Sequence, residues 1–254
     1  MGMRQYDLGF VSDKDIYEHV RETVHKYRRS INLEEFNKNI VDPIKLLLDS
    51  KIYGQTIKET INTECLRQID KSNNNCIGYF HQYIFRYAGD GWEVPRNGQK
   101  GGFDVLNERL HVYAEIKNKH NTMNYASASD TYAKMQNKLL TDDKATCYLV
   151  EVIAKGSHLQ NWNVTLKNRD GSKSQYSHER IKKTSMDRFY SVVFADDMAF
   201  CKLCRALPDI IDDVLKDEPE AHIQNSVYKE LGGESLYKEL FMLAFKGYNG
   251  FDKF

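Results

Sequence analysis

Two short apolar runs near the middle of the chain carry charged side chains where a buried strand ordinarily has none. The first run, residues 103–106, contains Asp104 shortly after a pair of glycines. The second run, residues 112–117, contains Glu115 and Lys117. Alternate residues of a strand point to the same face, so Glu115 and Lys117 project together. If the two runs pair across a turn at 107–109, Asp104 joins them.

Two carboxylates and one amine in this arrangement suit the hydrolysis of a phosphodiester. Mg²⁺ prefers oxygen ligands and is often held by one or two carboxylates together with phosphate and water. A bound metal ion activates water, and a lysine can orient the nucleophile or neutralise developing charge. The alternative is a surface hairpin with an ordinary Glu–Lys pair. The glycines before Asp104 and the polar run 118–124 after the strand favour a catalytic site.

The pattern of Asp104 followed by Glu115-Ile116-Lys117 resembles the signature of the PD-(D/E)XK nuclease superfamily. Phe103 stands where that signature usually has proline, a frequent departure. The wider segment 114–124 is similar to type II restriction endonucleases of the group that cuts GGNCC or GGWCC sites. The similarity covers the middle of the chain, from the region of Trp92 to the helix after Asn124.

The resemblance implies a role for each residue of the motif. Asp104 and Glu115 would bind Mg²⁺ together with the backbone carbonyl of Ile116, and Lys117 would be the catalytic amine. In such nucleases a helix of the N-terminal region often supplies one more acidic or amide group. The sequence offers two candidates for that group, Glu64 and Gln82, and either can equally be a plain surface residue.

The resemblance also implies partners. A palindromic site has a two-fold axis, so a homodimer on double-stranded DNA is expected. A DNA methyltransferase that protects the host site is expected as a functional counterpart and not as a stable partner. Two other functions stay open at this point: a repair or recombination nuclease of the same superfamily, and a noncatalytic DNA-binding module.

Polar residues after the predicted active-site strand are candidates for DNA contact. Asparagine and lysine side chains read base edges in the major groove, and free N–H groups at a helix start bind phosphate. The candidates are Asn118, Lys119, His120, Asn121 and Asn124, followed by Ser127, Ser129 and Thr131. The alternative is a solvated loop. The basic segment 167–183 fits either a DNA-recognition hairpin or a mobile surface loop.

The charge balance does not identify a nonspecific nucleic-acid binder. The chain has 36 basic and 36 acidic residues, so any basic DNA-binding cleft requires segregated charge. Cationic side chains gather around the motif, namely Lys117, Lys119, His120, Lys134 and Lys138, whereas the C-terminal third is rich in aspartate. Five cysteines predict a reducing cytoplasm, and the single CxxC at 201–204 lacks a second ligand pair for zinc. No apolar run reaches membrane-spanning length.

The order of elements predicts an α/β fold with a mixed central β-sheet flanked by helices. Helical patterns cover residues 13–29, 33–48, 56–69, 76–87, 129–140, 198–215 and 234–245, with a turn at 72–75. Strand patterns cover 92–95, 103–106, 111–117, 145–154, 162–166 and 190–194. We expect one nuclease domain, 1–254, with a mainly helical region at 1–90, the catalytic sheet at 91–195 and a helical region at 196–254.

Overall fold

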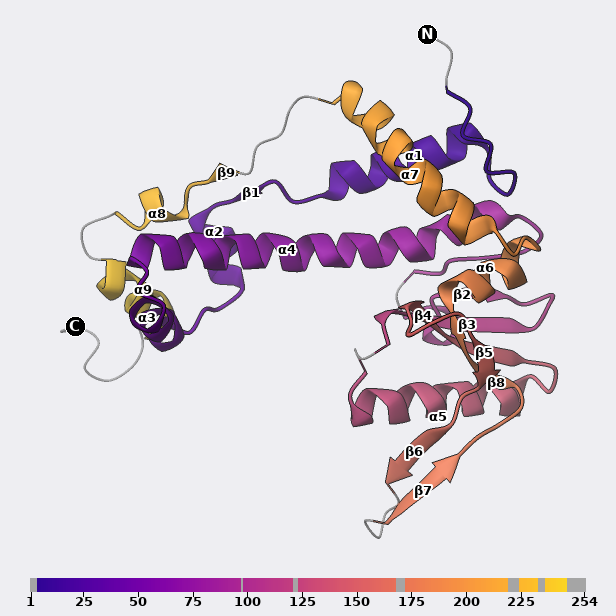
Figure 1. Ribbon diagram of the computed structural model, residues 1–254. Coiled ribbons are helices and arrows are strands. Elements are labelled where there is room, and N and C mark those ends of the chain that lie inside the picture. The colour runs from indigo at the N-terminus through magenta and orange to yellow at the C-terminus, as the bar shows by residue number, and fades with distance from the viewer. Residues whose placement is uncertain are drawn as a thin grey trace. The chain divides into compact units, whose positions relative to one another are not determined.

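A computed structural model describes residues 4–96, 98–120, 123–167, 172–218, 224–232 and 236–245. The chain forms two compact units (Figure 1). The first comprises residues 1–23 and 77–218, and we call it the catalytic unit because it holds the motif; the second comprises 24–76 and 219–254. That the chain is a single nuclease domain stays a prediction. No helix in the described ranges is long and apolar enough to cross a membrane.

A five-stranded sheet forms the centre of the catalytic unit. Its strands, in spatial order, are β2 (Val105–Asn107), β3 (Val112–Lys119), β4 (Thr146–Ile153), β8 (Ile181–Ser185) and β5 (Leu159–Asn161). The three central strands run parallel, and both edge strands are antiparallel to their neighbours. The predicted mixed sheet is therefore confirmed. In place of the strand predicted at 92–95, Glu93 makes an isolated bridge to Leu106.

Helices cover both faces of this sheet (Figure 1). They are α5 (Tyr125–Thr141) on one face and α6 (Met186–Phe194) on the other, and α7 (Ala199–Lys216) packs against α6. Tyr132 and Met135 of α5 belong to one buried cluster with Tyr113 and Leu149 of the sheet. On the opposite face Phe189 of α6 packs against Tyr148. Strand alternation produces both contacts, because residues 148 and 149 point to opposite faces.

Around the last central strand, one predicted element was wrong and one strand was not predicted. Residues 190–194, predicted as a strand, form the second half of α6. The residues buried in α6, Met186, Phe189, Tyr190 and Val193, recur at helical spacing, which the short apolar run concealed. Residues 181–185 form β8, a strand that was not predicted, because residues 181–183 were assigned to the polar segment 167–183. Its lysines concealed the strand, but Lys183 pairs with Glu151 and Lys182 with Asn161.

The second unit is mainly helical. Its elements are β1 (Ser30–Ile31), α2 (Leu33–Lys38), α3 (Pro43–Ile52), β9 (Gln224–Asn225), α8 (Val227–Glu230) and α9 (Leu236–Phe245). The helices α1 (Asp13–Lys26) and α4 (Ile57–Tyr83) contribute residues to both units. The helix predicted at 33–48 is divided in two, because Asp42 caps a new helix at Pro43. The turn predicted at 72–75 was wrong, since α4 runs through it.

The remaining elements of the catalytic unit are short. They are the 3₁₀ turns η1 (Ile84–Ala88) and η2 (Lys100–Gly102) and the antiparallel hairpin of β6 (Val164–Lys167) and β7 (Lys173–Tyr176). The turn η2 ends two residues before Asp104. Gly101 and Gly102 both have positive φ there, a conformation that glycine adopts without the cost other residues incur.

The packing of α6 gives a stability prediction. Phe189 is fully buried and its ring contacts those of Phe85, Trp92 and Tyr148. Replacement by alanine removes these contacts and leaves a cavity, so Phe189→Ala should lower the free energy of unfolding by about 3–5 kcal/mol. Urea unfolding measures the change. Leu140→Ala is the control, because that side chain is 84% exposed; equal losses for both variants would contradict the described packing.

Candidate functional site

The pairing of β2 with β3 brings Asp104 beside the Glu-x-Lys strand. Val105 lies opposite Ala114, and the backbone N–H of Asp104 donates to the Ala114 carbonyl at 2.9 Å. Two residues further along β3, Asp104 makes a second contact: its Oδ2 accepts a hydrogen bond from the N–H of Ile116 at 2.7 Å. The hairpin predicted from the sequence therefore holds the aspartate at the middle of β3.

Glu115 and Lys117 project from one face of β3, and their side chains are in contact. Lys117 Nζ donates to Glu115 Oε1 at 2.7 Å. Lys134 of α5 donates to the other carboxylate oxygen, Oε2. Glu115 is only 9% exposed, so this carboxylate is buried between two ammonium groups. Burial of a charge without such partners would be strongly unfavourable.

The electrostatics of the site make negative charge costly. Burial raises the pKa of Asp104 to about 6, and the nearby Glu115 carboxylate acts in the same direction. The Ile116 N–H, Lys117 and Lys134 act against this rise. Two carboxylates that repel each other in a partly buried place are stabilised in their charged forms by a cation.

The donor set at this place fits Mg²⁺. Asp104 Oδ1 accepts no hydrogen bond from the described residues. The N–H and C=O of one strand residue point to the same side. The Ile116 carbonyl therefore faces the same side as its N–H, which is bonded to Asp104. Within the part of the chain that is described, no three or more His, Cys, Asp or Glu side chains are placed to hold a metal ion by themselves. Two carboxylates and a carbonyl leave positions for phosphate and water, as Mg²⁺ sites commonly do.

The sequence analysis missed the part that Lys134 plays. It counted this lysine only among nearby cations, but Nζ also donates to the Gly102 carbonyl at 2.8 Å and lies 4.7 Å from the centre of the Phe103 ring. Lys134 thus ties α5 to the segment that carries Asp104. Its position between the buried residues Thr131 and Met135 of α5 was the available signal.

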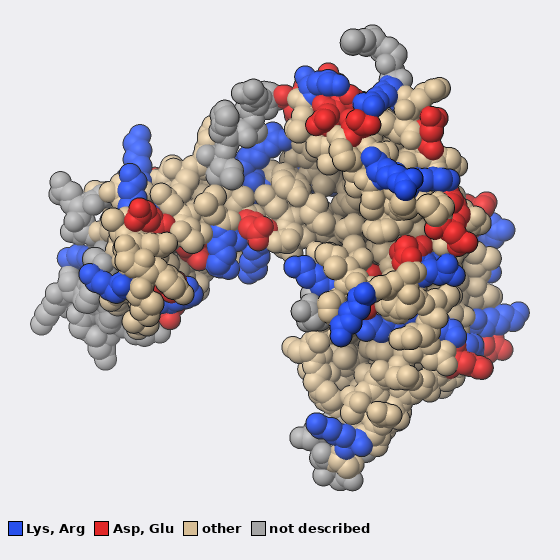
Figure 2. All heavy atoms as spheres, in the orientation of Figure 1, with Lys and Arg blue, Asp and Glu red and all other residues tan. Residues whose placement is uncertain are grey.

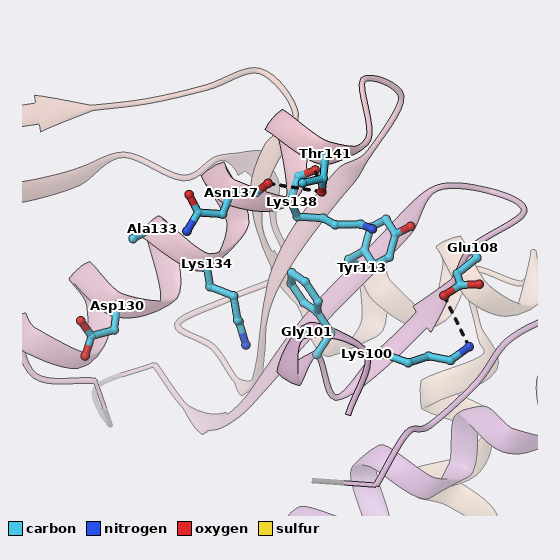
Figure 3. Close-up of a pocket in the computed structure, with 11 residues that line it drawn as sticks. Lys100, Gly101, Glu108, Tyr113, Asp130, Ala133, Lys134, Asn137, Lys138 and Thr141 are labelled. Atoms are coloured by element: carbon cyan, nitrogen blue, oxygen red, sulfur yellow. Dashed lines mark hydrogen bonds and ion pairs between the residues drawn. The ribbon is translucent and has the colours of Figure 1, made fainter. Parts of the chain in front are cut away.

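A pocket of about 630 Å³ opens beside Lys134 (Figure 3). Lys134 and Lys138 of α5 line it together with Tyr113, as Figure 3 shows. Phe103 also lines it. Lys138 Nζ lies 4.1 Å from the centre of the Tyr113 ring. Because Lys134 lines the pocket and also contacts Glu115, the pocket adjoins the carboxylate pair.

The two candidates for a further helix-borne ligand have different positions. Glu64 belongs to the second unit, and its carboxylate is occupied there. Arg67 Nε donates to Oε2 at 2.6 Å, and Gln68 Nε2 donates to Oε1 at 3.1 Å. These contacts hold the Glu64 carboxylate against α4, and its role as a metal ligand stays a prediction. Gln82 is half-buried near the end of α4 in the catalytic unit.

The candidate DNA-contacting residues continue from β3 into α5. Asn118 and Lys119 end β3, and the N–H of His120 donates to the Ile153 carbonyl at 3.0 Å. Asn121 lies outside the described residues. Asn124 caps α5, since its Oδ1 accepts from the Ser127 N–H at 2.9 Å.

The start of α5 corrects one detail of the sequence analysis. The helix begins at Tyr125, four residues before the predicted start. Ser129 therefore lies beyond the first four N–H groups, which are the ones a helix leaves for an anion. The Ser127 N–H is taken by Asn124, and Thr131 is buried. Any phosphate contact from Ser127 or Ser129 would have to use the hydroxyl, and this contact stays a prediction.

The contacts of Lys134 predict a stability difference between two neighbouring lysines. Lys134→Met removes one of the two cations that face the buried Glu115 carboxylate, so the free energy of unfolding should fall by ~1–3 kcal/mol without added metal. Lys138→Met is the matched control, because among the described residues the Lys138 ammonium group lies against the Tyr113 ring and no carboxylate, a contact worth about 0.5–1 kcal/mol. Urea unfolding compares the two. A loss for Lys134→Met no larger than that for the control would refute the assigned contact.

Comparison with known proteins gives the family. The family model described as Eco47II restriction endonuclease matches residues 8–216. The type II restriction enzyme Sau96I of Staphylococcus aureus is 27% identical over 212 residues, which cover 81% of this chain and 80% of that enzyme. The type II restriction enzyme Eco47II of Escherichia coli is 28% identical over 216 residues, which cover 83% and 89%. The matched region contains Asp104, Glu115, Lys117 and Lys134, and the resemblance to type II restriction endonucleases noted in the sequence is confirmed: the chain belongs to the Eco47II restriction endonuclease family.

Proposed function

We propose that this protein is a Mg²⁺-dependent type II restriction endonuclease that makes double-strand breaks at a short palindromic site of the GGNCC kind. The convergence of Asp104, Glu115 and Lys117 on the β2–β3 hairpin carries the proposal. Membership of a restriction endonuclease family supports it. The order of a β2–β3 hairpin, α5 and a parallel β4 is consistent with a PD-(D/E)XK nuclease core.

Asp104, Glu115 and the Ile116 carbonyl are the proposed metal ligands. When bound, Mg²⁺ would supply an activated water and neutralise charge on the scissile phosphate. Asp104 is held for this role by the Ile116 N–H, which fixes Oδ2 and leaves Oδ1 directed elsewhere. Glu115 is held by Lys117 and Lys134.

Lys117 is the proposed catalytic amine. Its side chain is partly exposed, whereas the carboxylate to which it donates is nearly covered. The ammonium group can therefore reach the solvent side of the site, where a phosphodiester would lie, while it remains hydrogen-bonded to Glu115. At that place it would orient the attacking water or stabilise the charge that develops on the phosphate.

The residues from Asn118 to Ser129 are the proposed DNA-contacting segment. Asn118, Lys119 and His120 continue directly from the catalytic strand, so a duplex bound at Glu115 would pass close to them. The same residues on a second subunit would contact the other half of a palindrome. The host DNA would then need a methyltransferase that modifies the same site.

The proposal predicts the effect of removing each ligand. Asp104→Ala and Glu115→Ala should each reduce cleavage at least about a thousandfold, because loss of a metal ligand removes several kcal/mol of transition-state stabilisation. Lys117→Met should fold and bind DNA but cleave very slowly. Plasmid cleavage time courses measure the rates, and circular dichroism and DNA binding check the fold. Near-native turnover in any of the three would remove that residue from the site.

The proposal also predicts the stoichiometry of the complex. Each chain carries one catalytic motif, so a double-strand break requires two copies, one for each strand. Light scattering of the complex with a short duplex that contains one site should give the mass of two chains and one duplex. A complex of one chain with one duplex would contradict the homodimer.

A further inference from the structure

The hairpin of β6 and β7 is an insertion between two strands of the central sheet. It follows β5 and precedes β8, and Figure 1 shows that it extends beyond the sheet. Its strands pair antiparallel, with Val164 opposite Tyr176, Thr165 opposite Gln175 and Leu166 opposite Ser174. The sequence left two interpretations of this region open, a DNA-recognition hairpin and a mobile surface loop.

One face of the hairpin is anchored to the core of the catalytic unit. Val164 is buried and belongs to the same hydrophobic cluster as Tyr132 of α5, and Leu166 packs against that cluster. Trp162, just before β6, is also buried and meets the Tyr132 ring edge-on at 5.3 Å. These contacts fix the base of the hairpin in the unit that holds Asp104 and Glu115.

The other face presents polar side chains to solvent. Alternation along each strand puts Thr165 and Gln175 on this face as a directly opposed pair. Lys173 lies two residues before Gln175 on β7, so it is on the same face. All three side chains are exposed, and no side-chain hydrogen bond or ion pair joins any of them to another described residue. Within the described part of the chain, no other side chain competes with a ligand for them.

The charge of the hairpin indicates an anionic ligand. Residues 154–178 contain four lysines and arginines and one acidic residue, Asp170. In the view of Figure 2, basic atoms and no acidic ones are visible on the described part of the hairpin. A segment with an excess of basic residues favours a polyanion such as DNA.

We propose that the β6–β7 hairpin reads DNA sequence, with Thr165, Lys173 and Gln175 directed at base edges in the major groove. A two-stranded ribbon fits the major groove, where glutamine pairs with adenine and lysine with guanine. The inference rests on the proposed function, because it assigns part of the recognition of that same substrate to residues outside the segment that follows β3. Phosphate contacts position a protein on DNA, whereas base contacts specify the sequence.

Binding of two duplexes tests the inference. Wild-type digestion of a plasmid first identifies the cleavage site. Lys173→Ala and Gln175→Ala are then made in a Lys117→Met background, so that the duplex stays intact with Mg²⁺ present. Fluorescence anisotropy gives the affinity for a duplex with the site and for one of equal length and composition without it. Lys14→Ala is the control, since Lys14 is an exposed lysine on α1 in the same unit.

We expect each hairpin variant to lose roughly tenfold or more in affinity for the specific duplex and less than about twofold for the other. The Lys14→Ala variant should leave the ratio of the two affinities unchanged. Equal losses on both duplexes would overturn the inference in favour of phosphate contact, and unchanged binding would also overturn it. Gln175→Met, which keeps the length and the neutral charge but loses the amide, should show the same selective loss and replaces any alanine variant that fails to fold.

The two proposals fail in different ways. A wild-type protein that does not cut at one sequence would refute the proposed function. A wild-type protein that cuts at one sequence, with hairpin variants that bind normally, would refute the hairpin alone.

Discussion

The short antiparallel pairing of β2 with β3 is the interaction on which the site depends. It places Val105 opposite Ala114, and the hydrogen bond from the Ile116 N–H to Asp104 Oδ2 follows from that register. A shift of one residue would turn every side chain of a strand to the other face. Asp104 and Glu115 would then point to different places, and the sheet core around Tyr113 and Leu149 would also be lost. The same register therefore determines both the stability of the core and the position of the carboxylates.

The site also requires a balance of charge. Glu115 is nearly covered and Asp104 is partly buried, so each carboxylate needs a partner in the folded chain. Lys117 and Lys134 donate to Glu115, and the Ile116 N–H donates to Asp104. Lys134 comes from α5, which packs on the sheet through Tyr132 and Met135. The helix thus contributes one ammonium group to the site as a consequence of its packing. The pocket beside it has Lys138 over the Tyr113 ring and is also lined by the acidic residues Glu108 and Asp130.

Local patterns sufficed to predict the hairpin, the apolar strand β4 and the grouping of Asp104, Glu115 and Lys117. Alternation within one strand and a short turn involve neighbouring residues only. The role of Lys134 depends on how α5 packs across the sheet, 19 residues from Glu115 in sequence, and no local pattern carries that information. The strand β8 was missed because its lysines find partners on β4 and β5 that only the fold supplies. Glu64 has the residue type and the helical position expected of a further metal ligand. Its carboxylate accepts hydrogen bonds from Arg67 and Gln68, which the sequence did not indicate.

The central claim is that the β2–β3 site cleaves DNA at one defined sequence. The most direct measurement is digestion of a plasmid of known sequence by the purified protein with Mg²⁺ and with EDTA, followed by sequencing of the fragment ends. We expect discrete fragments with Mg²⁺ only, and every end should fall at the same position in one short palindrome. An intact plasmid with Mg²⁺, or fragments whose ends share no sequence, would contradict the account.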